Sequence, residues 1–359
     1  GISDSAELNW KHAGLGGYFT SLFPPNVANS RFGAFWDCQF STCTSYVPSA
    51  VDSHGTAVAG VAFGTIENGE DINVSDPTLR IERSGIAPLV KPYYYSSTNT
   101  QNGEYVSSHI AILERAVSDG LDVLNHSYEW FICNPCDKSC DGGGYLQAEQ
   151  NSQAAGLLNV HAAGNAGDPG SCSVNPPASF RQGLAVAALN STDRLSDYHT
   201  MGIWPASARG GMDMTINGTT WGQVESLVDM AAPGCDSRLY AGGGPWSSEY
   251  SSGWGTSVAA PKVTGLVALV RNAWVSLGQP SIQDPDWLLA NTLLMTDGWG
   301  AASGGVTQSR FDIRTGAGRV HAWILNSTSL VAPWGWGCHA FTMTAAGQSQ
   351  TFTVGDSGP

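Results

Sequence analysis

The stretch GTSVAAPKVTG, residues 255–265, puts a glycine, a threonine and a serine directly before a run of small and β-branched residues. Apolar residues recur beyond it with helical spacing, so we expect a helix from about Thr256 to Leu277. Ser257 would then lie where a turn enters a long helix, with an exposed hydroxyl and a backbone N–H among the unpaired donors of the helix start. It is a candidate nucleophile, although a helix cap without chemistry has the same local pattern.

Short apolar runs alternate with helix-length segments between residues 50 and 295. The runs predict strands at 89–95, 121–125, 156–163 and 184–189, and the longer segments predict helices at 104–119 and from 284 onward. The last helix begins with an N-cap, a proline and an acid, Asp284-Pro285-Asp286. The alternation is typical of an α/β fold with a mostly parallel central sheet and helices on both faces. Active sites in such folds gather at the carboxyl ends of the strands.

Two further stretches carry residues with catalytic chemistry, DSHGTAVAG at 52–60 and HAAGNAG at 161–167. Together with residues 255–265, and in this order, they resemble the histidine, oxyanion-asparagine and serine blocks of the subtilisin-like serine peptidases. The resemblance implies that Ser257 is the nucleophile and His54 the general base and then general acid. It also implies that Asn165 and the Ser257 N–H form the oxyanion hole. Weaker similarities at 85–88, 229–234 and 315–320 extend the resemblance over residues 1–325.

The family places its triad aspartate first in the chain, at the end of a buried strand, and Asp4 is the residue that matches. The order Asp4, His54, Ser257 is then the subtilisin order. Ala6 stands where the family has glycine, and only three residues precede Asp4, so we expect its strand to be truncated. Asp37 and Asp52 are rivals. Asp52 is too close in sequence to His54 to support the ring from beneath, and Asp37 is expected in a loop beside Cys38.

The family binds extended substrate along the segment that follows the strand ending Asn125-His126-Ser127, a form of β-augmentation. The residues that the resemblance predicts to bind substrate are Ser127, Tyr128, Glu129, Ala163 and Gly164. Glu129 would favour a basic substrate side chain, or it is a solvated charge at the rim. Ala162, Ala163 and Gly164 are small either to leave room for a substrate group or because the sheet packs tightly there.

The composition argues against nucleic acid as a partner. The 359-residue chain has a formal net charge of −14 and no run of Lys or Arg, so phosphate backbones and anionic membranes would repel it. No stretch of about eighteen apolar residues exists, so no membrane span is expected. The catalytic chemistry requires no cofactor. Structural calcium is compatible with the acidic loops, although no ligands can be named.

Eight cysteines in a chain rich in Gly, Ser and Trp suggest disulfides and a secreted or extracellular location. Zinc is the alternative for the group Cys133, Cys136 and Cys140, whose flanks supply no obvious fourth ligand. Glycosylation sequons, which support secretion weakly, occur at Asn73, Asn125, Asn190, Asn217 and Asn326. Asn125 falls in a predicted core strand, where a glycan would not fit. No signal peptide is visible, so a secreted form would be mature or trimmed.

The sequence thus predicts a catalytic domain at 1–325 and the beginning of a β-rich module at 326–359. The expected function is a serine endopeptidase acting on protein or peptide substrates. A propeptide or a C-terminal β domain is a further candidate partner. One alternative is a peptide ligase or macrocyclase on the same scaffold, in which the insertion at 130–144 would shield the site from water. The other is a catalytically impaired peptide-binding module.

Overall fold

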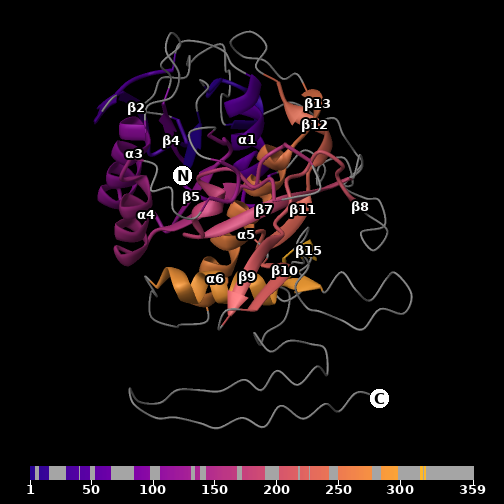
Figure 1. Cartoon of the computed structure of the whole chain (residues 1–359). Coiled ribbons are helices and arrows are strands. Elements are labelled where there is room, and N and C mark those ends of the chain that lie inside the picture. The colour runs from indigo at the N-terminus through magenta and orange to yellow at the C-terminus, as the bar shows by residue number, and fades with distance from the viewer. Residues whose placement is uncertain are drawn as a thin grey trace, which may run out of the picture.

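The computed structural model describes residues 1–4, 8–15, 30–39, 41–48, 53–65, 85–97, 106–130, 134–137, 143–167, 172–190, 202–216, 219–225, 227–241, 250–276, 284–297, 316–317 and 319–320. Over these residues the chain forms an α/β structure around one large sheet (Figure 1). No helix among them has both the length and the apolar character needed to cross a membrane.

The central sheet is mostly parallel, as predicted. Its hydrogen-bonded order is β14-β15-β11-β7-β6-β5-β1-β4-β2-β3, and β8 pairs with β7. Antiparallel pairs occur between β2 and β3, β7 and β8, and β14 and β15. The strands are β1 (Ile2–Asp4), β2 (Ala34–Gln39), β3 (Thr42–Ser45), β4 (Tyr93–Ser96), β5 (Val123–His126), β6 (Leu158–Ala162), β7 (Leu184–Asn190), β8 (Gly202–Ile203), β11 (Met230–Pro233), β14 (Thr296–Asp297) and β15 (Arg319–Val320).

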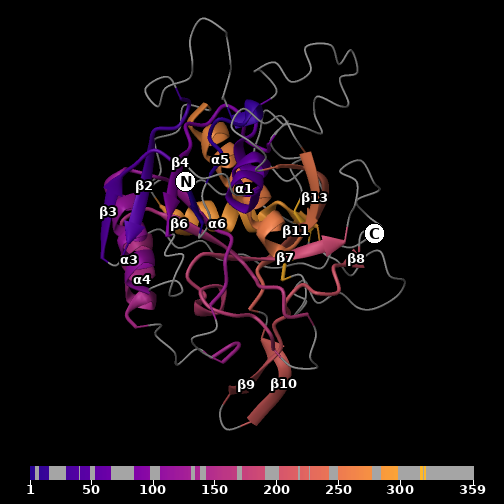
Figure 2. The ribbon, with the colours of Figure 1, turned by 90° about the horizontal axis from the view of Figure 1, so that it is seen from above.

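Helices cover both faces of the sheet. One face packs against α1 (Ser53–Phe63), α5 (Thr256–Ser276) and α6 (Pro285–Leu294), and the other against α3 (Val106–Ser118) and α4 (Tyr145–Ala154). Helices α3 and α4 lie side by side in both views (Figures 1 and 2). Side chains of successive strand residues point to opposite faces of the sheet: Val123 packs in the core with α5, and Leu124 packs in the core with α3.

Smaller elements lie outside the large sheet. Two hairpins are formed by β9 (Met212–Ile216) with β10 (Thr219–Glu225) and by β12 (Cys235–Tyr240) with β13 (Tyr250–Trp254). Figure 2 shows the β9–β10 hairpin projecting from the body of the molecule. Two short 3-10 turns are η1 (Ala13–Leu15) and η3 (Ala178–Phe180).

The predicted strands and helices are present, with differences at their ends. The strand expected from residue 89 begins only at Tyr93, because Leu89 lies in a turn and is 86% exposed. Asp37, predicted in a loop, lies instead in β2, where β3 pairs with it as a hairpin. The N-cap of α6 is confirmed, since Asp284 accepts from the backbone N–H groups of Asp286 and Trp287. Residues 326–359 lie outside the described residues, and the domain boundary at 325 stays a prediction.

Candidate active site

Asp4 and His54 are in direct contact. Asp4 is the last residue of β1 and is 1% exposed, whereas His54 lies in the first turn of α1 with 44% of its side chain exposed. His54 Nδ1 is 3.1 Å from Asp4 Oδ1 and 3.0 Å from Oδ2. An ionised carboxylate only accepts hydrogen bonds, so Nδ1 carries the proton that it donates to Asp4. In the neutral ring the other nitrogen, Nε2, is then the acceptor.

Helix α5 begins at Thr256, which makes Ser257 its second residue. Gly255, the residue before the helix, has φ +153°. A Cβ on Gly255 would lie 3.1 Å from Ser257 Oγ and 3.6 Å from Asn165 Oδ1. Ser257 and Asn165 therefore approach the same point from the helix start and from the end of β6. A side chain at position 255 would be tight against Ser257 Oγ and would have an unfavourable positive φ, which together explain the glycine.

A buried polar chain holds the start of α5 against β5. Ser127 Oγ donates to the Ser257 carbonyl over 3.0 Å and accepts from Asn125 Nδ2 over 2.8 Å. Asn125 Oδ1 in turn accepts from Thr264 Oγ1, further along α5, over 3.1 Å. Asn125 is fully buried, in agreement with the prediction that it cannot carry a glycan.

Asn165 is exposed three residues beyond the end of β6, and Thr256 orients its amide. The Asn165 Oδ1 accepts from both the backbone N–H and the hydroxyl of Thr256, each over 3.0 Å. The same hydroxyl oxygen accepts from the Gly164 N–H over 3.1 Å. Because two donors fix the oxygen end of the amide, Nδ2 is the end that is left to donate to a bound group. The sequence did not single out Thr256, although it stands next to Ser257.

Glu129 joins the segment after β5 to the segment after β6. Its Oε1 accepts from the Asn165 N–H over 3.3 Å, and its Oε2 accepts from Asn175 Nδ2 over 3.0 Å. A Cβ on Gly164, which has φ +108°, would come within 2.5 Å of Glu129 Oε2. Gly164 is therefore small because the carboxylate approaches it. Asn175 was missed, since nothing in its sequence surroundings marks it.

The other predicted substrate-binding side chains are buried. Tyr128 is 8% exposed, stacks on Trp130, and its hydroxyl lies 2.7 Å from His126 Nδ1. Ala163 is fully buried and packs in the same apolar group as Ala185 and Ala208, so tight packing accounts for its size. Contact of substrate with these two residues would involve the backbone.

Two disulfides link described cysteines. Cys38 bonds Cys43 across the β2–β3 hairpin, and Cys136 bonds Cys172. The second disulfide ties residues 134–137 of the insertion to the segment that carries Asn175, and the Cys136 N–H donates to the Val174 carbonyl over 2.8 Å. Its formation argues against Cys136 as a zinc ligand. Cys133, Cys140 and Cys338 lie outside the described residues, as does Asp52.

Behind Tyr128 lies a buried group of ionisable residues. His126 at the end of β5 is stacked on His161 of β6, with ring centroids 4.6 Å apart, and Glu149 of α4 reaches His161. Burial is the main cause that lowers the pKa of His126 well below its usual range, and His161 adds to the effect. Burial also raises the pKa of Glu149. The nitrogen-rich set does not suit calcium, which prefers oxygen ligands.

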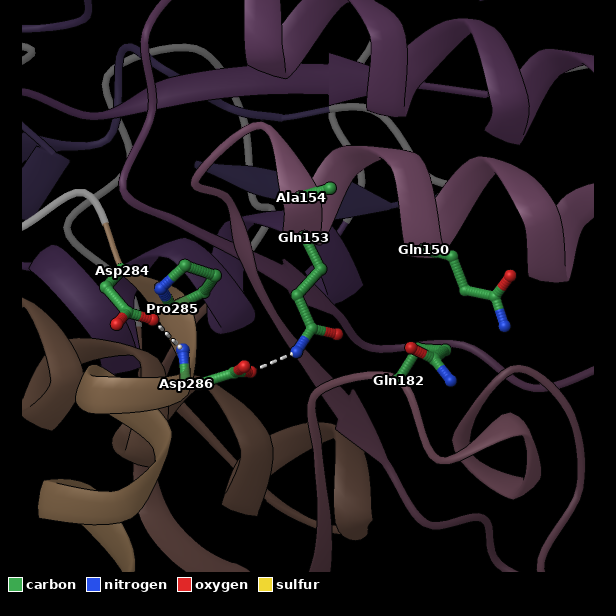
Figure 3. A pocket seen from close by; sticks show the side chains of 7 residues that line it. All are labelled: Gln150, Gln153, Ala154, Gln182, Asp284, Pro285 and Asp286. Atoms are coloured by element: carbon green, nitrogen blue, oxygen red, sulfur yellow. Dashed lines mark hydrogen bonds between the residues drawn. The ribbon is translucent and has the colours of Figure 1, made fainter. Parts of the chain in front are cut away.

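A polar hollow lies elsewhere, between the end of α4 and the start of α6 (Figure 3). It is lined by Gln150, Gln153, Ala154, Gln182, Asp284, Pro285 and Asp286. Figure 3 shows Gln153 reaching across to Asp286, with its Nε2 2.5 Å from the Asp286 carboxylate. None of the residues predicted to act in catalysis or substrate binding lines it.

Comparison with known proteins gives one family. The profile of the Subtilase family matches residues 2–310. Subtilisin DY of Bacillus licheniformis is 25% identical over 233 residues, which cover 63% of this chain and 72% of that protein. A thermophilic serine proteinase of Bacillus sp. (strain AK1) is 29% identical over 228 residues, which cover 63% of this chain and 44% of the relative. The chain thus spans less than half of that relative's length.

Solved structures with the same fold include the prenylagaramide maturation protease PagA and sphericase. PagA superposes with a TM-score of 0.60 at 19% identity, over 90% of both chains. Sphericase superposes with a TM-score of 0.59 at 21% identity, over 89% of this chain and 90% of its own. At these identities the likeness concerns the fold alone.

Proposed function

Because the chain belongs to the subtilase family, we propose that it is a serine endopeptidase that forms an acyl-enzyme on Ser257. The family and its subtilisin relatives support a serine peptidase. The observation that carries the finer proposal is the contact of His54 Nδ1 with the buried Asp4 carboxylate, at 3.0 and 3.1 Å. In a neutral imidazole this contact places the proton on Nδ1 and leaves Nε2 as the basic nitrogen, as a general base requires.

In the proposed mechanism, Ser257 Oγ attacks the carbonyl carbon of the peptide bond while His54 Nε2 takes the Oγ proton. His54 then gives this proton to the amine as the C–N bond breaks, which leaves an ester on Ser257. Water, deprotonated by the same nitrogen, hydrolyses the ester. Asp4 stays ionised and stabilises the imidazolium without taking the proton.

The oxyanion hole would consist of Asn165 Nδ2 and the Ser257 N–H. The Ser257 N–H belongs to the unpaired donors at the start of α5. The two bonds from Thr256 to Asn165 Oδ1 hold the amide in place before substrate arrives, so little reorganisation is needed during the reaction. In subtilisin, removal of the corresponding side-chain donor costs about 3–4 kcal/mol of transition-state stabilisation, and we expect a loss of that order here.

For the substrate, Glu129 supports a preference for Lys or Arg on the acyl side of the cleaved bond. Its carboxylate is held between the Asn165 N–H and the Asn175 amide, beside the proposed oxyanion donor. Both partners are neutral, so the negative charge remains available to a cation. A simple solvated rim charge would not be fixed by two such bonds.

An extracellular setting is also proposed. The disulfides Cys38–Cys43 and Cys136–Cys172 support an oxidising compartment. Among the described sequons, Asn190 at the end of β7 is exposed and remains a candidate for glycosylation. Calcium and a propeptide remain proposals without named contacts.

The experiment that tests the function is labelling with a fluorophosphonate probe, followed by peptide mapping. We expect a stoichiometric adduct on Ser257 that disappears in Ser257→Ala and slows strongly in Asp4→Asn. Ser252→Ala, which changes an exposed serine of β13, is the matched control and should label normally. Folded protein without an adduct would contradict the proposal and favour a peptide-binding module. Product analysis with an added amine then separates hydrolysis from ligation, since a ligase would yield mainly the aminolysis product.

A further inference from the structure

A compact set of metal-ligand side chains lies in the core behind the segment 127–129. His126 and His161 are register partners on the neighbouring strands β5 and β6, and Glu149 comes from α4. One potential ligand atom from each residue lies within 4.8 Å of those of the other two. His126 and Glu149 are fully buried and His161 is 1% exposed. Three elements far apart in sequence thus bring two imidazoles and a carboxylate together.

The carboxylate of this set lacks hydrogen bonds of good geometry from the described residues. Glu149 Oε1 lies 2.8 Å from His161 Nε2, and the Gln182 carbonyl lies 3.1 Å from the same nitrogen, so two oxygens compete for one N–H. Within the described part of the chain, neither Glu149 oxygen nor His161 Nδ1 has a hydrogen bond of good geometry, although the Tyr145 hydroxyl and His161 lie close enough to the carboxylate to favour its ionised form. A buried polar atom without a partner destabilises the fold, and a charged one does so more strongly. Three such atoms in one place point to a cation as their common partner.

We infer that His126, Glu149 and His161 bind one divalent ion of the zinc class in the core. Two histidines and a glutamate are ligands that zinc accepts, and such a set leaves a fourth coordination position for water or a carbonyl. The hydrogen bonding around His126 fits this assignment. Its Nδ1 is 2.7 Å from the Tyr128 hydroxyl, the kind of partner that orients a ligating imidazole from behind. Its Nε2 is 3.1 Å from Asn159 Oδ1, the contact that the ion would replace.

The proposed ion would have a structural role. It would tie α4 to β5 and β6 immediately behind Tyr128, whose backbone belongs to the proposed substrate-binding segment. Because the three ligands are almost inaccessible, the ion would enter while the chain folds and would resist chelators afterwards. The inference is independent of the proposed peptidase activity, since Ser257, His54 and Asp4 take no part in it.

The test is the metal content of the full chain folded with added ZnCl2, desalted, and measured by inductively coupled plasma mass spectrometry. We expect about one equivalent of zinc in the unaltered chain and in the control Glu114→Gln, which changes an exposed glutamate of the neighbouring helix α3. Glu149→Gln keeps the size of the side chain but removes the anionic ligand, and should retain less than a tenth of an equivalent. Folded wild-type chain without zinc, or equal retention by Glu149→Gln, would overturn the inference.

A second measurement covers the case in which Glu149→Gln does not fold. The unaltered chain is folded with CoCl2, and the cobalt environment is read by X-ray absorption and visible spectroscopy. Two imidazole nitrogens and carboxylate oxygen around a four- or five-coordinate ion are the expected result. Thiolate ligands, or oxygen ligands only, would assign the metal to another site and reject this one.

Discussion

Replacing Thr256 by valine should lower kcat through Asn165, although Thr256 would not touch the substrate. Thr256 supplies both donors to Asn165 Oδ1, and valine removes one of them while keeping the backbone N–H and the shape of the side chain. One net hydrogen bond is worth about 1 kcal/mol, which corresponds to a roughly fivefold lower kcat. KM should change little, because the lost orientation matters where the oxyanion develops.

The variant is best measured in a double-mutant cycle with Asn165→Ala. The single change Asn165→Ala should lower kcat by about 10²–10³. In that background Thr256→Val should have almost no further effect on kcat, since no amide remains to be held. Each variant is titrated for active sites, because the Gly164 N–H loses its acceptor and stability falls by about 1–3 kcal/mol. The positioning role would be refuted if the double variant showed the product of the two single losses in kcat. It would also be refuted if Thr256→Val alone left kcat unchanged.

Three other predictions concern charge, pH and cross-linking. In a peptide-library assay, Glu129→Gln should lower kcat/KM roughly fivefold more for substrates with Lys or Arg before the cleaved bond than for leucine substrates, which share only the loss of one accepting oxygen; equal losses on both would reject a charge effect. Burial raises the pKa of Asp229 from 3.8 to about 6, so the folded state binds the extra proton and stability falls as pH rises between these values. Asp229→Asn should abolish that slope and stabilise the chain at pH 7 by at most about 3 kcal/mol, in denaturant unfolding at several pH values; an unchanged slope would contradict the assignment. Replacing Cys136 and Cys172 together by alanine should lower the free energy of unfolding by up to about 4 kcal/mol, because the disulfide closes a separation of 36 residues. An unchanged denaturation midpoint would show that this disulfide does not stabilise the fold.

The fold could be predicted from the sequence to the level of its elements. The periodicity of apolar residues is strong in α3, α5 is marked by a long run of small and apolar residues, and Asp284-Pro285-Asp286 predicts the N-cap of α6. The start of β4 was placed too early because Leu89 and Val90 look like strand residues, whereas Pro92 and the turn before it delay pairing. Asp37 was misplaced because a hairpin closed by two nearby cysteines has no long apolar run.

The site was predictable where chemistry is concentrated in short motifs and unpredictable where it depends on contacts across elements. His54, Asn165 and Ser257 stand in such motifs, and the contact of Asp4 with His54 is the one that the family resemblance implies. Asn175 and Glu149 have no such context. Each contacts its partners only because an insertion or a helix packs against the sheet, and neither periodicity nor spacing in the sequence predicts these contacts.

The position of β1 has a consequence for the timing of activity. The first strand of the chain is not at an edge but between β4 and β5, with parallel pairing on both sides. On the proposed function, a molecule that has not yet inserted this strand has no carboxylate beneath its imidazole, and one that has not docked α5 has no nucleophile. Contacts so distant in sequence form slowly and late. Each molecule would therefore begin to cut only after its own vulnerable segments had entered the sheet, which limits self-digestion during maturation.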